Sequence, residues 1–159
     1  MKNGTLDKLD KLILYELQKD ARHTSSNDIA ERMDVSSSTV RNRIKILEDE
    51  EIIRGYDVDV DYEKVGYDLY ALIICTAPIP KREQLAKEAR EVPGVVKVRE
   101  IMTGEENIHI AAVGSNKGDL SRIGRDLNEL GLDVADEDLI YHEFTHALHT
   151  FNMKIDDIQ

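Results

Sequence analysis

Two histidines and a glutamate near the end of the chain have the spacing of a zinc peptidase site. The stretch HEFTHALH, residues 142–149, contains H-E-x-x-H, in which histidines one helical turn apart bind zinc and the glutamate acts as general base. This chemistry requires a helix. Ile140, Phe144 and Leu148 recur at helical spacing and favour one.

The residues before this motif favour a strand instead. The segment VADEDLIYHEF, residues 134–144, is the candidate for the last strand of a sheet, and on a strand His142 and Glu143 face opposite sides. With five histidines in the chain, a chance match is also common. We therefore predict no catalytic residues, no metal and no cofactor, while a metal role for His142, His146 and His149 stays open.

Composition points to a protein of the cytoplasm. No apolar run approaches the roughly 18 residues of a membrane helix, and the first residues lack the apolar core of a signal peptide. The single Cys75 lies in the apolar run ALIICTA, residues 71–77, so we expect a small core residue rather than a disulfide or a nucleophile.

The charge distribution matters more than the net charge of −11, which by itself disfavours a nucleic-acid partner. Residues 1–60 hold 10 Lys and Arg against 13 Asp and Glu, and residues 61–159 hold 11 against 19. Within the first part, residues 35–47 (VSSSTVRNRIKIL) contain no acid and three basic residues. This basic window is a candidate contact for phosphate.

The elements that hold this window predict a helix-turn-helix. Apolar residues at helical spacing indicate a first helix over 7–20, and Ser25 with Asp28 forms a capping box for a short second helix. The serine-rich break at 34–38 offers Ser36 or Ser37 as the N-cap of a third helix. Three helices with a tight turn before the third are typical of this motif.

A recognition helix needs residues for bases at its start and donors for phosphates beside them. Arg and Asn side chains make bidentate contacts with guanine and adenine, and hydroxyls at a helix start hold phosphate. The predicted partner is double-stranded DNA, and the predicted contacts are Ser36, Ser37, Ser38, Thr39, Arg41, Asn42, Arg43 and Lys45.

The rest of the chain alternates strands and helices in the order β-α-β-β-α-β, the ferredoxin-like pattern. We expect a short strand and a linker between the two halves, so that residues 1–60 form one domain, 61–68 a linker and 69–159 a second domain. The predicted class is α+β.

Nearly the whole chain resembles the Lrp/AsnC group of bacterial and archaeal transcription factors. The resemblance rests on LDKLDKLILYELQKDAR, on DIAERMDVSSSTVRNRIKILEDEEIIRGY and on TGEENIHI. It implies a winged helix-turn-helix domain joined to a ferredoxin-like domain that pairs subunits into homodimers and larger assemblies such as octamers. It also implies a small effector, commonly an amino acid, bound between dimers.

The effector site implied by the resemblance is a glycine-containing turn, here Thr103, Gly104, Glu106 and Asn107. Gly104 matches the family pattern. Glu106 stands where the family has an aromatic residue, and Asn107 replaces an aspartate that would pair with an ammonium group. A different effector and a plain hairpin turn are both open interpretations.

One enzyme class is an alternative, because sirohaem decarboxylases resemble this group in both domains. Such an enzyme needs His and cationic side chains around a tetrapyrrole. Arg99 and His109 are the candidates, and they are isolated in the sequence. The regulator is therefore the predicted function.

Overall fold

The computed structural model describes residues 6–148 and residue 151, and it divides the chain into two compact units. Unit 1 contains the N-terminal residues to Val58 together with the chain from Phe144 onward, and unit 2 contains Asp59–Glu143. The C-terminal part of the predicted second domain therefore belongs to the unit that holds the N-terminal helices.

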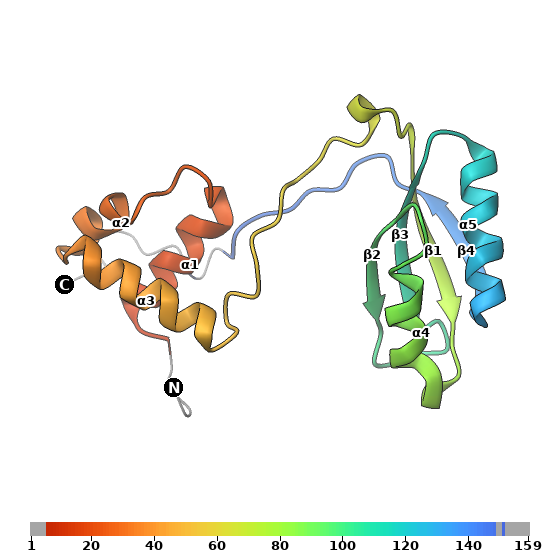
Figure 1. Ribbon diagram of the computed structural model, residues 1–159, viewed down its shortest axis with the longest axis horizontal. Coiled ribbons are helices and arrows are strands. Elements are labelled where there is room, and N and C mark those ends of the chain that lie inside the picture. The colour runs from red at the N-terminus through yellow and green to blue at the C-terminus, as the bar shows by residue number, and fades with distance from the viewer. Residues whose placement is uncertain (1–5, 149–150, 152–159) are drawn as a thin grey trace. The chain divides into compact units, whose positions relative to one another are not determined.

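Unit 1 contains three helices, α1 (Lys8–Asp20), α2 (Ser26–Met33) and α3 (Ser37–Asp49) (Figure 1). Each begins at a residue that caps its free N–H groups. Asp7 and Ser25 form capping boxes with the residues three positions on, and the Ser36 side chain accepts a hydrogen bond from the Thr39 N–H. The three predicted helices, the Ser25 capping box and the Ser36 cap are confirmed, and the Asp7 capping box is an additional finding.

The turn between α2 and α3 is tight because one residue takes a left-handed conformation. Asp34 has φ 50° and ψ 46°, and its N–H bonds the Ala30 carbonyl at the end of α2. The three helices enclose one apolar cluster, made of Leu9, Leu12, Ile13, Leu14, Ile29, Ala30, Val40 and Leu47.

Unit 2 is a four-stranded antiparallel sheet of order β2-β3-β1-β4, covered on one face by two helices (Figure 1). The strands are β1 (Leu69–Thr76), β2 (Val95–Glu100), β3 (Ile108–Gly114) and β4 (Asp133–Leu139). The helices are α4 (Arg82–Ala89) and α5 (Lys117–Leu130). Short 3₁₀ turns lie at Glu63–Val65 and Ile79–Lys81. The ferredoxin-like topology is confirmed.

The two faces of this sheet differ because side chains alternate along each strand. On the covered face, residues such as Ile73 and Ile110 join Leu85 of α4 and Ile123 of α5 in one core cluster. Cys75 belongs to this core, and burial raises the pKa of its thiol to about 11, as expected for an inert core residue.

Two predicted elements differ from the structure. The first is the short strand expected between α3 and β1. The described chain has no strand there, and this segment pairs with no other strand. The expected last strand ends at Leu139 rather than reaching Phe144, because beyond Ile140 the backbone leaves the ladder of β1.

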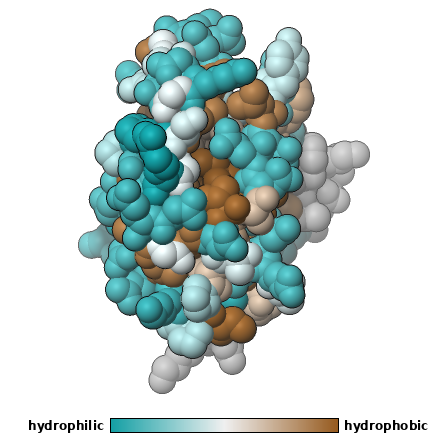
Figure 2. Space-filling model, turned by 90° about the vertical axis from the view of Figure 1, so that its right-hand side faces the viewer, coloured by the Kyte–Doolittle hydropathy of each residue, from teal (hydrophilic) through white to brown (hydrophobic). Residues whose placement is uncertain are grey.

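Charged and polar side chains cover most of the surface in Figure 2, and hydrophobic residues gather there in a central strip. No helix within residues 6–148 is long and apolar enough to cross a membrane.

Candidate nucleic-acid interface

The third helix has an inner and an outer side, which the structure separates clearly. Val40 and Leu47 are fully buried, and Ile44 packs against the same cluster. On the outer side, Ser38, Arg41, Asn42 and Lys45 are exposed, and their spacing of three, four and seven residues places them on one face. The sequence-predicted contacts therefore lie together, with one exception.

The exception is Arg43, whose side chain points to α1 instead of outward. Its Nη1 donates to Asp7 Oδ2 at 2.6 Å and to Asp10 Oδ1 at 2.9 Å. The Asp10 side chain is only 1% exposed. A buried carboxylate left without a cation is strongly unfavourable, so Arg43 is required by the fold. Arg43 thus fastens α3 to the start of α1, and the expectation that it reads bases stays a prediction.

This three-residue ion cluster also sets the charge state of its members. Burial raises the pKa of the Asp7 carboxyl, but hydrogen bonds from the Asp10 N–H and from Arg43 outweigh it and hold that pKa below its usual value. Hydrogen bonds to both carboxylates raise the pKa of Arg43. Asp7 and Arg43 are therefore both charged at neutral pH.

The start of α3 is rich in hydroxyl groups held by one another. Ser36 Oγ lies 2.8 Å from both Ser38 Oγ and Thr39 Oγ1, and Arg41 Nη2 donates to Ser37 Oγ at 3.2 Å. All these groups are at or near the surface and precede the exposed basic residues. Hydroxyls and N–H groups at a helix start, followed by Arg and Lys, can bind a phosphate backbone.

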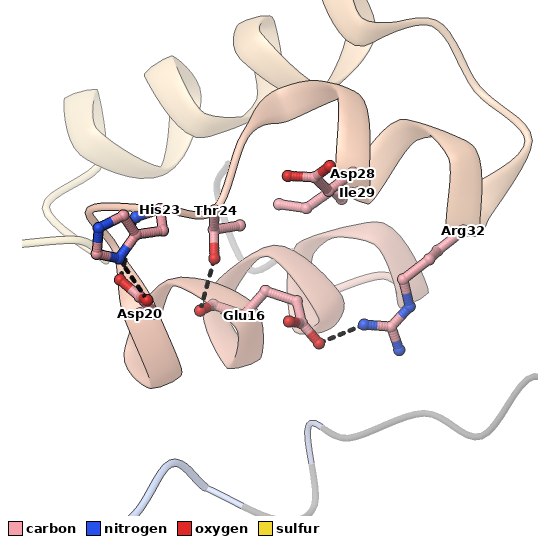
Figure 3. Close-up of a pocket in the computed structure, with 7 residues that line it drawn as sticks. All are labelled: Glu16, Asp20, His23, Thr24, Asp28, Ile29 and Arg32. Carbon is pink, nitrogen blue, oxygen red and sulfur yellow. Dashed lines mark hydrogen bonds and ion pairs between the residues drawn. The ribbon is translucent and has the colours of Figure 1, made fainter.

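A polar pocket of about 270 Å³ lies between α1 and α2 (Figure 3). His23 Nδ1 lies 2.8 Å from Asp20 Oδ2, Arg32 pairs with Glu16, and Thr24 Oγ1 donates to the Glu16 carbonyl. These side chains satisfy one another. These contacts link α1 to α2, and the polar groups that make them are engaged by one another rather than by a ligand.

The predicted effector turn in unit 2 is partly exposed and partly structural. Thr103, Gly104 and Glu106 are exposed, and Gly104 has φ +94°, a left-handed conformation that favours glycine. Asn107 differs from the expectation, because its side chain is 4% exposed and faces inward. Its amide accepts from the Ala77 N–H at 2.8 Å and donates to the Ala77 carbonyl at 2.9 Å.

The zinc motif does not form its required helix. Residues 142–148 have no regular secondary structure, and His149 lies outside the described residues. Within residues 6–148 and 151, no three His, Cys, Asp or Glu side chains are grouped as metal ligands. Glu143 instead accepts a hydrogen bond from Tyr70 Oη at 3.1 Å and lies 3.5 Å from the Arg99 guanidinium.

Arg99 and His109, isolated in the sequence, are partners across β2 and β3. This proximity does not make a tetrapyrrole site by itself, because the Arg99 charge is shared with Glu143.

Comparison with known proteins agrees with this architecture. A winged helix-turn-helix DNA-binding family model matches residues 6–54. An uncharacterised HTH-type transcriptional regulator of Pyrococcus horikoshii is 38% identical over 117 residues, covering 74% of this chain and 78% of the relative. The regulator LrpA of the same organism is 35% identical over 108 residues, covering 68% and 74%.

Among solved structures, a Neisseria meningitidis transcriptional regulator in complex with L-methionine is 31% identical. It matches with a TM-score of 0.73 over 90% of this chain and 94% of its own. The fold and site define a helix-turn-helix regulator of transcription. The chain belongs to the Lrp/AsnC family of these regulators, and the comparisons do not favour the sirohaem decarboxylase alternative.

The ion cluster generates a prediction about pH. Asn caps a helix as well as Asp does, so Asp7→Asn removes charge while keeping the cap. A lowered folded pKa stabilises the protein above the unfolded pKa of about 3.9, and this contribution disappears as pH falls through the folded pKa. We expect Asp7→Asn to lower the free energy of unfolding by about 0.5–1 kcal/mol at pH 7, since Asp7 is half exposed.

Denaturant unfolding at pH 7, 4 and 2 measures this difference, which should shrink towards zero at pH 2. Asp57→Asn, on the exposed segment after α3, is the control. A difference that stays constant from pH 7 to pH 2 contradicts an electrostatic role for Asp7.

Proposed function

We propose that the exposed face of α3 binds an operator through a defined set of residues. The observation that supports this proposal is that α3 has two different sides. Arg43 lies on the inner side in an ion cluster, whereas Arg41, Asn42 and Lys45 are exposed on the outer side. Arg41 and Asn42 supply donors for base edges, and Lys45 and the hydroxyls of Ser36, Ser37, Ser38 and Thr39 supply contacts for phosphate.

The protein is proposed to act as a dimer formed by the open face of the sheet. This face carries four apolar residues that do not belong to the core cluster on the other face. They are Leu72 and Ile74 of β1, and Ala111 and Val113 of β3. Lys97 and Arg99 flank them on β2, and Asp136 and Asp138 flank them on β4. A second copy related by an axis along the strands sets the basic edge of one sheet against the acidic edge of the other.

Dimerisation matters for affinity, because one short basic helix on a chain of net charge −11 is a weak anchor. Two tethered recognition helices bind a two-fold operator far more tightly than one. With chromosomal DNA as the partner, we place the protein in the cytoplasm, and we assign it no enzymatic activity. We also propose that these dimers assemble further, into octamers or other larger assemblies.

The exposed turn at Thr103, Gly104 and Glu106 is the proposed effector site. The related Neisseria regulator was solved with L-methionine, which supports an amino acid as the class of ligand. Because the Asn107 side chain is engaged by Ala77, the Glu106 carboxylate is the proposed partner for the ligand's ammonium group. Ligand binding shifts DNA affinity to the extent that it favours one assembly over another.

Arg41→Ala and Lys45→Ala test the two proposed kinds of DNA contact. Loss of a bidentate base contact costs about 1–3 kcal/mol at the matched site, so Arg41→Ala should weaken operator binding far more than binding to scrambled DNA. Lys45→Ala should weaken both equally and reduce the salt slope by about one. Fluorescence anisotropy at several salt concentrations, on the DNA upstream of the gene, measures this.

Lys87→Ala is the matched control, since it removes the same charge from an exposed position on α4. Identical losses for Arg41→Ala and Lys45→Ala on both DNAs contradict the division of roles, and no effect from either removes α3 as the interface.

Leu72→Glu tests the dimer interface. A carboxylate at the centre of an apolar face is desolvated when two sheets pack, so we expect a monomer in multi-angle light scattering where the native chain is a dimer. Glu88→Gln on the surface of α4 serves as control. An unchanged dimer mass for Leu72→Glu places the interface elsewhere.

Isothermal titration with the twenty amino acids tests the effector site. We expect at least one to release heat, and Glu106→Gln to weaken its binding about tenfold or more through loss of a charged hydrogen bond. Glu105→Gln, the adjacent exposed carboxylate, is the control. Absence of heat from all twenty would rule out an amino-acid effector.

A further inference from the structure

Tyr70, Arg99 and Glu143 meet on the face of the unit 2 sheet that the helices leave open. Tyr70 alternates with the core residue Ala71 on β1, and Arg99 follows Val98, which packs against the core, on β2. Tyr70 Oη donates to Glu143 Oε2 at 3.1 Å, and Arg99 Nη2 lies 3.5 Å from Glu143 Oε1. All three residues belong to unit 2.

The Glu143 carboxylate therefore bridges two strands that are not neighbours. Because β3 lies between β1 and β2 in the sheet, a group bonded to both Tyr70 and Arg99 extends across β3. Ala111 and Val113 of β3 are only 1% and 5% exposed, although neither belongs to the core cluster under the helices. The chain's own side chains thus occupy part of the face through which we propose that it dimerises.

Two hydrogen bonds with Tyr70 hold residues 140–143 to β1. The Ile140 N–H donates to the Tyr70 carbonyl at 2.7 Å, and the Tyr70 hydroxyl donates to Glu143. Burial and the bond to Glu143 raise the pKa of Tyr70, so its hydroxyl stays protonated and able to donate at neutral pH. The Arg99 and Glu143 side chains are 43% and 39% exposed, so their ion pair is weak enough to be exchanged for another.

The strand register places Arg99 in one row with an acidic residue at the opposite edge of the sheet. Arg99 of β2 pairs with His109 of β3. Ile74 of β1 pairs with His109 on one side and with Asp136 of β4 on the other. A two-fold axis along the strands keeps each row at its own height, so it sets Arg99 opposite Asp136 of a second copy.

We propose that Glu143 is an internal competitor for the dimer interface. In the single chain Glu143 holds Arg99, and in the dimer Arg99 exchanges this partner for Asp136 of the second copy. Each dimer requires two such exchanges, so the strength of the Glu143 contact sets how readily the chain dimerises. This inference rests on the proposed dimer, and it adds the residue that regulates dimer formation.

Glu143→Gln and Glu137→Gln form a matched pair for the competition. Both remove one negative charge, but Glu137 pairs with the core residue Ile73 and so lies on the other side of the sheet. Because a weak ion pair is lost twice per dimer, we expect Glu143→Gln to lower the dimer dissociation constant about fivefold relative to Glu137→Gln. Sedimentation velocity of the labelled full chain, with fluorescence detection over a dilution series, measures this constant.

Tyr70→Phe and Asp136→Asn test the two ends of the exchange. Tyr70→Phe keeps every charge but removes the hydroxyl that holds Glu143, so it should also tighten the dimer, by about twofold or more. In an Asp136→Asn background Arg99 gains no charged partner on dimerisation. There, Glu143→Gln should change the dissociation constant by less than about twofold.

Equal dissociation constants for Glu143→Gln and Glu137→Gln overturn the competition, as does an unchanged constant for Tyr70→Phe. An undiminished effect of Glu143→Gln in the Asp136→Asn background overturns the exchange with Asp136. In each of these cases a native chain that still dimerises leaves the proposed dimer standing. Monomers of the native chain and of Glu143→Gln alike, at every concentration, contradict the dimer itself.

Discussion

The charge of Asp10 is the constraint on which the DNA-binding unit depends. A carboxylate that is almost completely buried has lost its hydration, and Arg43 lies within hydrogen-bond distance of it. Since Arg43 comes from the recognition helix, the need to neutralise Asp10 fixes that helix against α1. Within the basic window, residues 35–47, Arg43 therefore stabilises the fold, whereas Arg41 and Lys45 stay exposed and available to DNA.

The two faces of the sheet in unit 2 also have different roles. Its covered face is filled by α4 and α5, and its open face carries apolar residues in the two central strands and opposite charges on the two edge strands. Edge charges discourage unlimited strand addition, while a central apolar patch favours one face-to-face partner. Glu143 accepts a hydrogen bond from Tyr70 and lies beside Arg99 on this face.

Much of the fold could be predicted because its signals are local. Capping residues at Asp7, Ser25 and Ser36 mark helix starts, and Gly131, with φ +103°, ends α5 in the left-handed conformation that glycine favours. The order of strands and helices then leaves few topologies, and the ferredoxin-like one is observed. The absent strand after α3 and the early end of β4 were mispredicted, because alternation alone cannot show whether a neighbouring strand is present to pair.

The sequence by itself determined the helix-turn-helix, the basic window and the βαββαβ order, since periodicity and capping act over a few residues. Only the tertiary structure decided that Arg43 bonds Asp10, that Asn107 bonds Ala77, and that the Leu148 N–H bonds Gln18 of α1. Contacts between residues 30, 33 and 130 positions apart depend on how the chain folds back on itself, and no local pattern records that.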